Sequence, residues 1–254
     1  MDKWRLIDIR VEDAVTQMAM DEAIAKARIP EDNPNTVRLY RWKPSAVSIG
    51  YFQSITKEVN LEECERLGVD VIRRITGGGA VFHDYNGEIT YSLVAPENDP
   101  KMPRDILESY RAICGAIVGG LSHLGVDSEF KPVNDIGAGG KKISGNAQTR
   151  RHGVILQHGT VLVDSDLETM FKVLRVSNAK ISDKLIKAVE ERVTNIRRYL
   201  GRDVPWSEAR DALVAGFEES FNVELVPGDL TPREYELVEE NKKHYSSREW
   251  VYQR

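Results

Sequence analysis

Three consecutive glycines, Gly77–Gly79, stand between two segments that read as strands, residues 69–74 and 80–82. Glycine costs backbone entropy and supplies no packing, so this position requires bare backbone. One interpretation is a tight hairpin. The other is a loop that lets an anionic ligand approach the main chain, with Arg73 or Arg74 supplying positive charge. The paired arginines favour the second interpretation. The G-x-G-x-x-G spacing of a dinucleotide site is absent.

A second glycine-rich segment follows Asn134-Asp135 and contains Gly139-Gly140-Lys141-Lys142. It is not a P-loop, because Lys142 stands where that motif needs Ser or Thr. The segment is either a solvated basic turn between two strands or a site where one lysine lies over a phosphate. The residues alone leave both interpretations open.

Histidine and cysteine give weaker indications. His158 lies in an apolar strand expected over residues 153–163, where a lone histidine is more often a hydrogen-bonded structural residue than a catalyst. Cys114 falls on the apolar stripe of a helix expected over residues 106–124, and Cys64 lies among three carboxylates. The sequence contains no H-E-x-x-H, C-x-x-C or G-x-S-x-G motif.

Composition restricts the class of protein. The 254 residues carry 35 Lys+Arg against 40 Asp+Glu, a formal charge of −5, which argues against a nucleic-acid partner. No apolar run approaches the roughly 18 residues that span a membrane, and the N-terminus is no signal peptide, so we expect a soluble, cytoplasmic protein. No linker or repeat interrupts residues 1–254, which predicts a single domain.

Local patterns predict an α+β fold. We expect a strand over residues 4–10, a helix over 14–28 with Asp13 as N-cap, and a hairpin at Asn86-Gly87. Helices are expected near residues 183–192, 208–217 and 232–240, the last beginning at a capping box with proline. Early strands followed by helices favour an α+β sheet protein over a βαβ repeat.

Taken in order, four segments resemble the motifs of the lipoate–protein ligase family: residues 73–84, 134–135, 140–147 and 157–160. The first is similar to R-R-x-[ST]-G-G-G-A-V-[FY]-H-D and the third to G-x-K-[IV]-S-G-x-A. The resemblance runs from Trp4 to Trp250. It implies a mainly antiparallel mixed sheet flanked by helices, as in biotin–protein ligases.

The resemblance also implies two half-reactions. Lipoate and MgATP would give lipoyl-adenylate, and the lipoyl group would pass to a lysine of an acceptor, either a lipoyl domain of a 2-oxoacid dehydrogenase complex or the glycine-cleavage H protein. Lys142 would be the catalytic residue, and Asp135 would hold Mg²⁺ or the adenylate amine. The implied binding residues are Arg73, Arg74, Gly77, Gly78, Gly79, Ala80, Val81, Phe82, His83, Asp135, Lys142, Gly145, Ala147 and His158.

Other activities are weighed against this one. Two types of octanoyltransferase in the same superfamily use a cysteine, either just upstream or downstream of the lysine segment. Neither region has a cysteine here, so the sequence disfavours an octanoyl or lipoyl transferase. The G-R-G-R-x-G loop of a biotin ligase is absent. A non-catalytic lipoate-binding accessory protein is a third alternative, against which the intact Lys142 speaks.

Many ligases of this family carry a small C-terminal domain. Because the sequence ends at Arg254, four residues past Trp250, we expect that domain to be absent. Some archaeal-type members resemble this arrangement and receive the small domain as a separate chain. We therefore expect a separate small accessory subunit that completes the site for adenylation.

Overall fold

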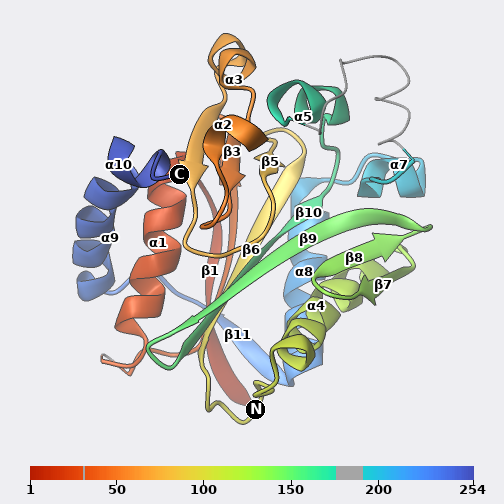
Figure 1. The fold of residues 1–254 in the computed structure, drawn as a ribbon. Coiled ribbons are helices and arrows are strands. Elements are labelled where there is room, and N and C mark those ends of the chain that lie inside the picture. The colour runs from red at the N-terminus through yellow and green to blue at the C-terminus, as the bar shows by residue number, and fades with distance from the viewer. Residues whose placement is uncertain (31, 176–190) are drawn as a thin grey trace.

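A computed structural model describes residues 1–30, 32–175 and 191–254. Two sheets and their flanking helices form an α+β fold, as the sequence predicts (Figure 1). The helix expected near residues 183–192 lies almost wholly outside the described residues. Among the described helices, none combines the length and the apolar character needed to cross a membrane.

The strands are β1 (Asp2–Glu12), β2 (Thr36–Trp42), β3 (Ala46–Ile49), β4 (Asp70–Arg73), β5 (Val81–His83), β6 (Glu88–Pro96), β7 (Ser128–Lys131), β8 (Asp135–Ala138), β9 (Lys141–Arg151), β10 (Val154–Leu162) and β11 (Val223–Pro227). The helices are α1 (Ala14–Ala27), α2 (Ile55–Glu58), α3 (Leu61–Leu67), α4 (Ile106–His123), α5 (Leu167–Val173), α7 (Ile196–Leu200), α8 (Trp206–Phe221), α9 (Pro232–Tyr245) and α10 (Arg248–Val251).

Eight strands form the large sheet in the order β11-β1-β2-β6-β10-β9-β8-β7. Only β11, β1 and β2 run parallel to one another, so the predicted mainly antiparallel mixed sheet is confirmed. Side chains alternate across β2: Leu39 packs with α4 and α8 on one face, and Tyr40 packs with α1 and α9 on the other. Helices therefore cover both faces of the sheet (Figure 1).

Predicted helix boundaries follow from capping. Asp13 caps α1 by accepting from the backbone N–H of Thr16, and Thr231 with Glu234 forms the capping box of α9. The Glu234 carboxylate is buried and also accepts two bonds from the Arg5 guanidinium, at 2.7 and 2.6 Å. This bidentate pair ties helix α9 to strand β1.

Two of the expected turns are not hairpins. Strands β4 and β5 lie on opposite sides of β3 in the small sheet, so Gly77–Gly79 crosses the end of that sheet instead of joining neighbours. The prediction of a hairpin at Asn86-Gly87 is wrong, because the strands on either side belong to different sheets: β5 to the small sheet and β6 to the large one. Gly87 is needed there for close packing: a Cβ on it would lie 2.3 Å from the Cα of Ser165.

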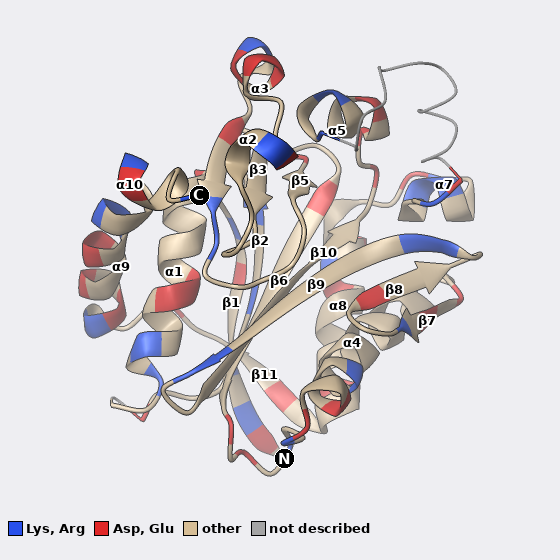
Figure 2. Ribbon diagram, viewed as in Figure 1, with Lys and Arg blue, Asp and Glu red and all other residues tan. Residues whose placement is uncertain are grey.

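Charged residues are concentrated away from the interior of the sheet. Figure 2 shows them gathered on the outer helices, with α9 carrying both signs, while the central strands are largely uncharged. Strand β9 is an exception, because it has basic residues at both of its ends, Lys141-Lys142 and Arg150-Arg151. One basic end of this strand, Lys141-Lys142, lies beside the cavity described below.

A test of the packing between α4 and α8 uses Gly216. A Cβ there would lie 2.2 Å from the carbonyl oxygen of Ala116 and 2.4 Å from the backbone nitrogen of Gly120. Gly216→Ala should therefore separate the helices and cost about 1–3 kcal/mol, lowering the melting temperature by several degrees. Gly115→Ala is the control, because its Cβ would meet nothing within 4 Å, and it should leave melting unchanged or slightly raised. Equal effects in thermal denaturation would contradict this account.

Candidate functional site

A cavity of about 100 Å³ lies between the two sheets. The small sheet contributes Ser48 from β3 and Val81 and His83 from β5. The segment between β4 and β5 that contains Gly77–Gly79, here called the glycine segment, forms one side of the cavity. The large sheet supplies most of the remaining wall from β2, β6, β9 and β10, helix α1 adds one residue, and Asn134 comes from the turn before β8. Those remaining residues are Met18, Tyr40, Trp42, Thr90, Asn134, Lys142, Gly145, Asn146, Ala147, His158, Gly159 and Thr160.

The structure brings together most of the residues that the sequence predicts as binding residues. The cavity wall includes Arg74, Gly78, Gly79, Ala80, Val81, His83, Lys142, Gly145, Ala147 and His158. The other four predicted residues, Arg73, Gly77, Phe82 and Asp135, do not line it.

Strand geometry explains the position of Phe82. Successive side chains in a strand point to opposite faces, so Val81 and His83 face the cavity while Phe82 packs into the core beneath the small sheet. Gly77 takes part only through its carbonyl oxygen, which accepts from Arg74. Neither residue is placed to contact a ligand in the cavity.

Arg73 has a structural position instead of the expected binding one. Its guanidinium is buried and donates to five main-chain carbonyl oxygens, which belong to Gly50, Tyr51, Gln53, Trp250 and Val251. These bonds hold the C-terminal helix α10 against the loop after β3. Arg73 thus satisfies buried backbone acceptors and presents no charge to the cavity.

Arg74 organises the glycine segment. All five of its N–H groups are used: Nε donates to Thr76 Oγ1, Nη1 donates to the carbonyl oxygen and Oγ of Ser48, and Nη2 donates to the carbonyl oxygens of Gly77 and Gly79 at 2.8 and 2.7 Å. Burial lowers the pKa of Arg74 to about 10, which still leaves it protonated at neutral pH. No ion pair of Arg74 is found in the described part of the chain, so its charge is available to the cavity.

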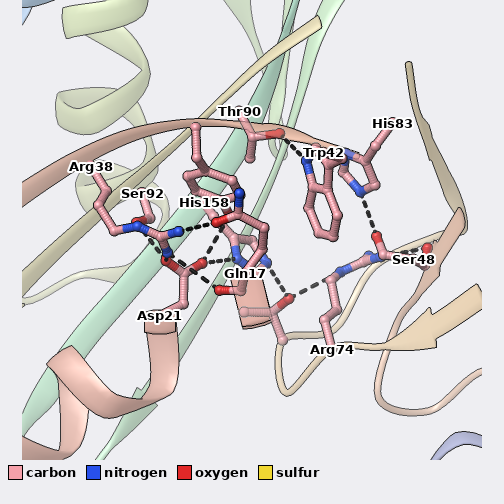
Figure 3. Close-up of polar contacts among 12 residues, drawn as sticks. Gln17, Asp21, Arg38, Trp42, Ser48, Arg74, His83, Thr90, Ser92 and His158 are labelled. Carbon is pink, nitrogen blue, oxygen red and sulfur yellow. Dashed lines mark hydrogen bonds and ion pairs between the residues drawn. The ribbon is translucent and has the colours of Figure 1, made fainter. Parts of the chain in front are cut away.

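His158 is held between a hydroxyl and a carboxylate (Figure 3). Its Nε2 lies 2.8 Å from Thr76 Oγ1, and its Nδ1 lies 3.0 Å from Asp21 Oδ2. Burial lowers the pKa of His158, so the ring is neutral at pH 7. Burial by itself would raise the pKa of Asp21, but the charge of Arg38 and the bond from His158 outweigh it, and the pKa falls.

His83 occupies a matching position on the other side of Arg74 (Figure 3). Its Nε2 lies 2.8 Å from Ser48 Oγ, and its Nδ1 lies 2.9 Å from Glu88 Oε1. Thr90 Oγ1 lies 2.5 Å from the same carboxylate oxygen. The Trp42 ring stacks on the imidazole with centroids 4.1 Å apart, so the ring of His83 is fixed by packing as well as by hydrogen bonds.

Sequence reasoning missed Ser48, Trp42, Thr90 and Asp21. Each is an ordinary residue of a strand or helix, and none belongs to the motif segments that drew attention in the sequence. The alternation of side chains along a strand could have predicted that Trp42 and Thr90 share one face of the large sheet. It could not have predicted that this face lies opposite the small sheet. Trp42 and Thr90 of the large sheet reach His83 of the small sheet through the packing of the two sheets. Ser48 reaches His83 through the pairing of β3 with β5, and Asp21 reaches His158 from α1.

Lys142 lies in strand β9 instead of in a loop, and its side chain is 44% exposed. Its Nζ is 2.7 Å from Asp135 Oδ1, so the predicted residue Asp135 pairs with Lys142 beside the cavity. A Cβ on Gly145 would lie 2.7 Å from both Cε and Nζ of Lys142, so this glycine makes room for the ammonium group. Within the described residues, no group of three or more His, Cys, Asp or Glu could hold a metal ion.

Neither cysteine lines the cavity. Cys114 lies on the buried face of α4, and burial raises the pKa of its thiol to about 12. Burial, together with the charge of Glu63, raises the pKa of Cys64 to about 11. A thiolate is therefore not available at the cavity at neutral pH.

Residues 13–218 match the family model of the lipoyl protein ligase A/B catalytic domain. Octanoyltransferase LipM of Kyrpidia tusciae is 39% identical, over 100% of both chains, and that of Staphylococcus aureus is 33% identical, over 100% of this chain and 99% of the relative. Among solved structures, the bi-partite lipoate protein ligase of Thermoplasma acidophilum has a TM-score of 0.88 and 34% identity, covering 99% of this chain and 96% of that one. A lipoate-protein ligase A bound with ATP has a TM-score of 0.85 and 33% identity, over 99% and 98% of the two chains.

These relatives correct the predicted activity. The prediction of an ATP-dependent lipoate–protein ligase is wrong, because the full-length relatives are named octanoyltransferase LipM. ATP, Mg²⁺ and lipoate as reactants are wrong for the same reason. The argument against an octanoyltransferase relied on the missing cysteine, but a hydroxyl or an amine can also attack an activated acyl group. The separate accessory subunit was expected for adenylation, so the corrected activity gives it no support.

The conformation of the glycine segment can be tested at Gly78. Its φ is +94°, and a Cβ there would lie 3.0 Å from Nη2 of Arg74. Gly78→Ala should therefore cost roughly 1–2 kcal/mol and lower the melting temperature by a few degrees. Gly79→Ala is the matched control, since its Cβ would meet nothing within 4 Å, and its melting temperature should stay near that of the parent. A lower melting temperature for Gly79→Ala than for Gly78→Ala would refute the Arg74 arrangement.

Proposed function

Because this chain belongs to the family of lipoyl protein ligase A/B catalytic domains, we propose that it is an octanoyltransferase. It moves an octanoyl group from the thioester of an acyl-carrier protein to the ε-amine of a lysine on a lipoyl domain or on the glycine-cleavage H protein. The names of the full-length relatives support the acyl group. A lipoyl-domain acceptor is supported by the T. acidophilum neighbour, which was studied with its E2 lipoyl domain.

The reaction needs no nucleotide, because a thioester is already an activated acyl group. The overall change forms a C–N bond to the acceptor lysine and breaks a C–S bond, and the thiol leaves with one proton from the amine. A negative charge develops on the carbonyl oxygen in the transition state. The function of the site is therefore to align the acyl group and to stabilise that charge.

The observation that carries the proposal is the position of Lys142. Lys142 belongs to the wall of the cavity and its side chain is 44% exposed, so it lies where a partner's acyl group enters. Asp135 at 2.7 Å orients it. A positive charge at this place can bond to the carbonyl oxygen as it becomes negative.

The remainder of the cavity suits an acyl chain. Trp42, Met18 and Val81 supply apolar surface, and Gly78-Gly79 leave space for the chain beside the backbone. Arg74 keeps this segment in place by holding the carbonyl oxygens of Gly77 and Gly79. We take residues 1–254 as one catalytic domain that carries the whole site.

The direct experiment incubates the purified chain with octanoyl-acyl-carrier protein and a lipoyl domain, without ATP, and follows the mass of the lipoyl domain. We expect one octanoyl group on the acceptor lysine. A parallel reaction contains free octanoate with MgATP. Modification in the second reaction alone would contradict the proposal, and binding of octanoate without modification in either reaction would indicate a non-catalytic protein.

Replacing Lys142 tests its role. Lys142→Ala should lower the transfer rate at least ~100-fold, the usual loss when one oxyanion contact is removed, while the melting temperature changes little because the side chain is half exposed. Lys141→Ala is the neighbouring control with the same change in charge, and its effect on transfer should be small. Gly145→Ala should also slow transfer, because its Cβ would displace the Lys142 ammonium. Equal losses for the two lysine variants would refute the assignment.

A further inference from the structure

Ser48, His83 and Glu88 form a hydroxyl–imidazole–carboxylate chain in the cavity wall. Ser48 Oγ lies 2.8 Å from His83 Nε2, and His83 Nδ1 lies 2.9 Å from Glu88 Oε1. Ser48 and His83 both line the cavity, and Glu88 is fully buried. These distances are within the range in which a histidine can take a proton from a serine.

Donor-only groups at the two ends fix the proton positions. The Arg74 guanidinium can only donate, and it donates to Ser48 Oγ at 3.1 Å, which leaves the serine proton free to be donated to His83 Nε2 at 2.8 Å. That nitrogen is then the acceptor, and Nδ1 is the ring nitrogen that donates to Glu88.

The contacts at the Glu88 end of the chain of groups favour the same direction of proton donation. The Trp42 indole N–H can only donate, and it donates to Thr90 Oγ1 at 2.7 Å. The Thr90 proton is therefore donated to Glu88 Oε1. The carboxylate oxygen accepts from both neighbours, and this orients the imidazole with Nε2 toward Ser48.

We propose that Ser48 is the nucleophile of the transfer and carries the octanoyl group as an ester between donor and acceptor. This inference rests on the octanoyltransferase function proposed above. It accounts for how a chain without a thiol at the cavity performs the transfer in two steps. Arg74, 3.1 Å from Ser48 Oγ and without a paired carboxylate in the described part of the chain, stabilises negative charge that develops beside the serine.

In the first step, Ser48 Oγ attacks the thioester carbonyl carbon and its proton passes to His83 Nε2. The C–S bond then breaks, and the leaving thiolate takes that proton. In the second step, the neutral amine of the acceptor lysine attacks the ester carbon and gives a proton to His83 Nε2. The C–O bond breaks, and Ser48 Oγ recovers the proton. No group is oxidised or reduced.

The chain contains a close comparison, Thr76-His158-Asp21, with the same order of groups and a bond from Arg74 to the hydroxyl. Both hydroxyl residues are buried, but Ser48 lines the cavity and Thr76 does not. A secondary hydroxyl without access to the cavity cannot meet an acyl group. The Thr76 chain therefore supports Arg74, and Ser48 is the reactive member of the pair.

The test omits the acceptor, incubates the full chain with octanoyl-acyl-carrier protein, and measures the intact mass and the modified peptide. We expect one octanoyl group on Ser48. Ser48→Ala should lose this adduct and at least ~100-fold in transfer rate, while Ser48→Cys should still be acylated. The Cys64→Ala/Cys114→Ala double variant has no thiol and should still form the adduct, which excludes a cysteine ester.

The outcomes separate the two proposals. Acceptor modification that continues in Ser48→Ala, with no ester on the parent chain, would overturn the role of Ser48 and leave the octanoyltransferase function standing. An adduct found on Thr76, Lys142 or a cysteine would also overturn it. If the parent chain transfers no octanoyl group from the thioester to a lipoyl domain, the proposed function itself fails. Melting temperatures of each variant show whether a loss reflects unfolding.

Discussion

The site depends on one buried guanidinium, that of Arg74. A buried charge without a carboxylate is costly, and here it is tolerated because all five N–H groups of Arg74 have oxygen acceptors. These acceptors belong to the glycine segment, to β3 and to the hydroxyls of Ser48 and Thr76. The same group therefore fixes the loop, joins the two histidine chains and places positive charge beside the cavity.

The two sheets give this arrangement its function. The large sheet supplies His158 and Lys142, and the small sheet supplies Ser48 and His83, so the cavity exists only where one sheet packs on the other. The glycines allow the segment between β4 and β5 to follow this boundary, since Gly50 and Gly78 approach so closely that a Cβ on Gly50 would lie 2.1 Å from the Gly78 carbonyl oxygen. Larger side chains would separate the two halves of the site.

Local signals predicted the local structure well. Asp13 and the Thr231–Glu234 box mark the beginnings of their helices, and the apolar stripe with Cys114 faces the core. The hairpin at Asn86-Gly87 failed, because a turn signal does not say to which sheet the next strand belongs. The motifs also identified the family and about half of the residues in the cavity wall. They could not reveal Ser48 or Trp42. The absence of a cysteine led to the wrong activity, because a thiol is only one of the nucleophiles that can carry an acyl group.

The most direct measurement is a crystal structure of the chain with a ketone analogue of an octanoyl thioester, in which a methylene group replaces the sulfur. We predict that the alkyl chain lies against Trp42 and the Gly78-Gly79 backbone. The carbonyl should lie between Ser48 Oγ and the ammonium group of Lys142. An analogue bound outside this cavity, or with its carbonyl away from both residues, would contradict the account.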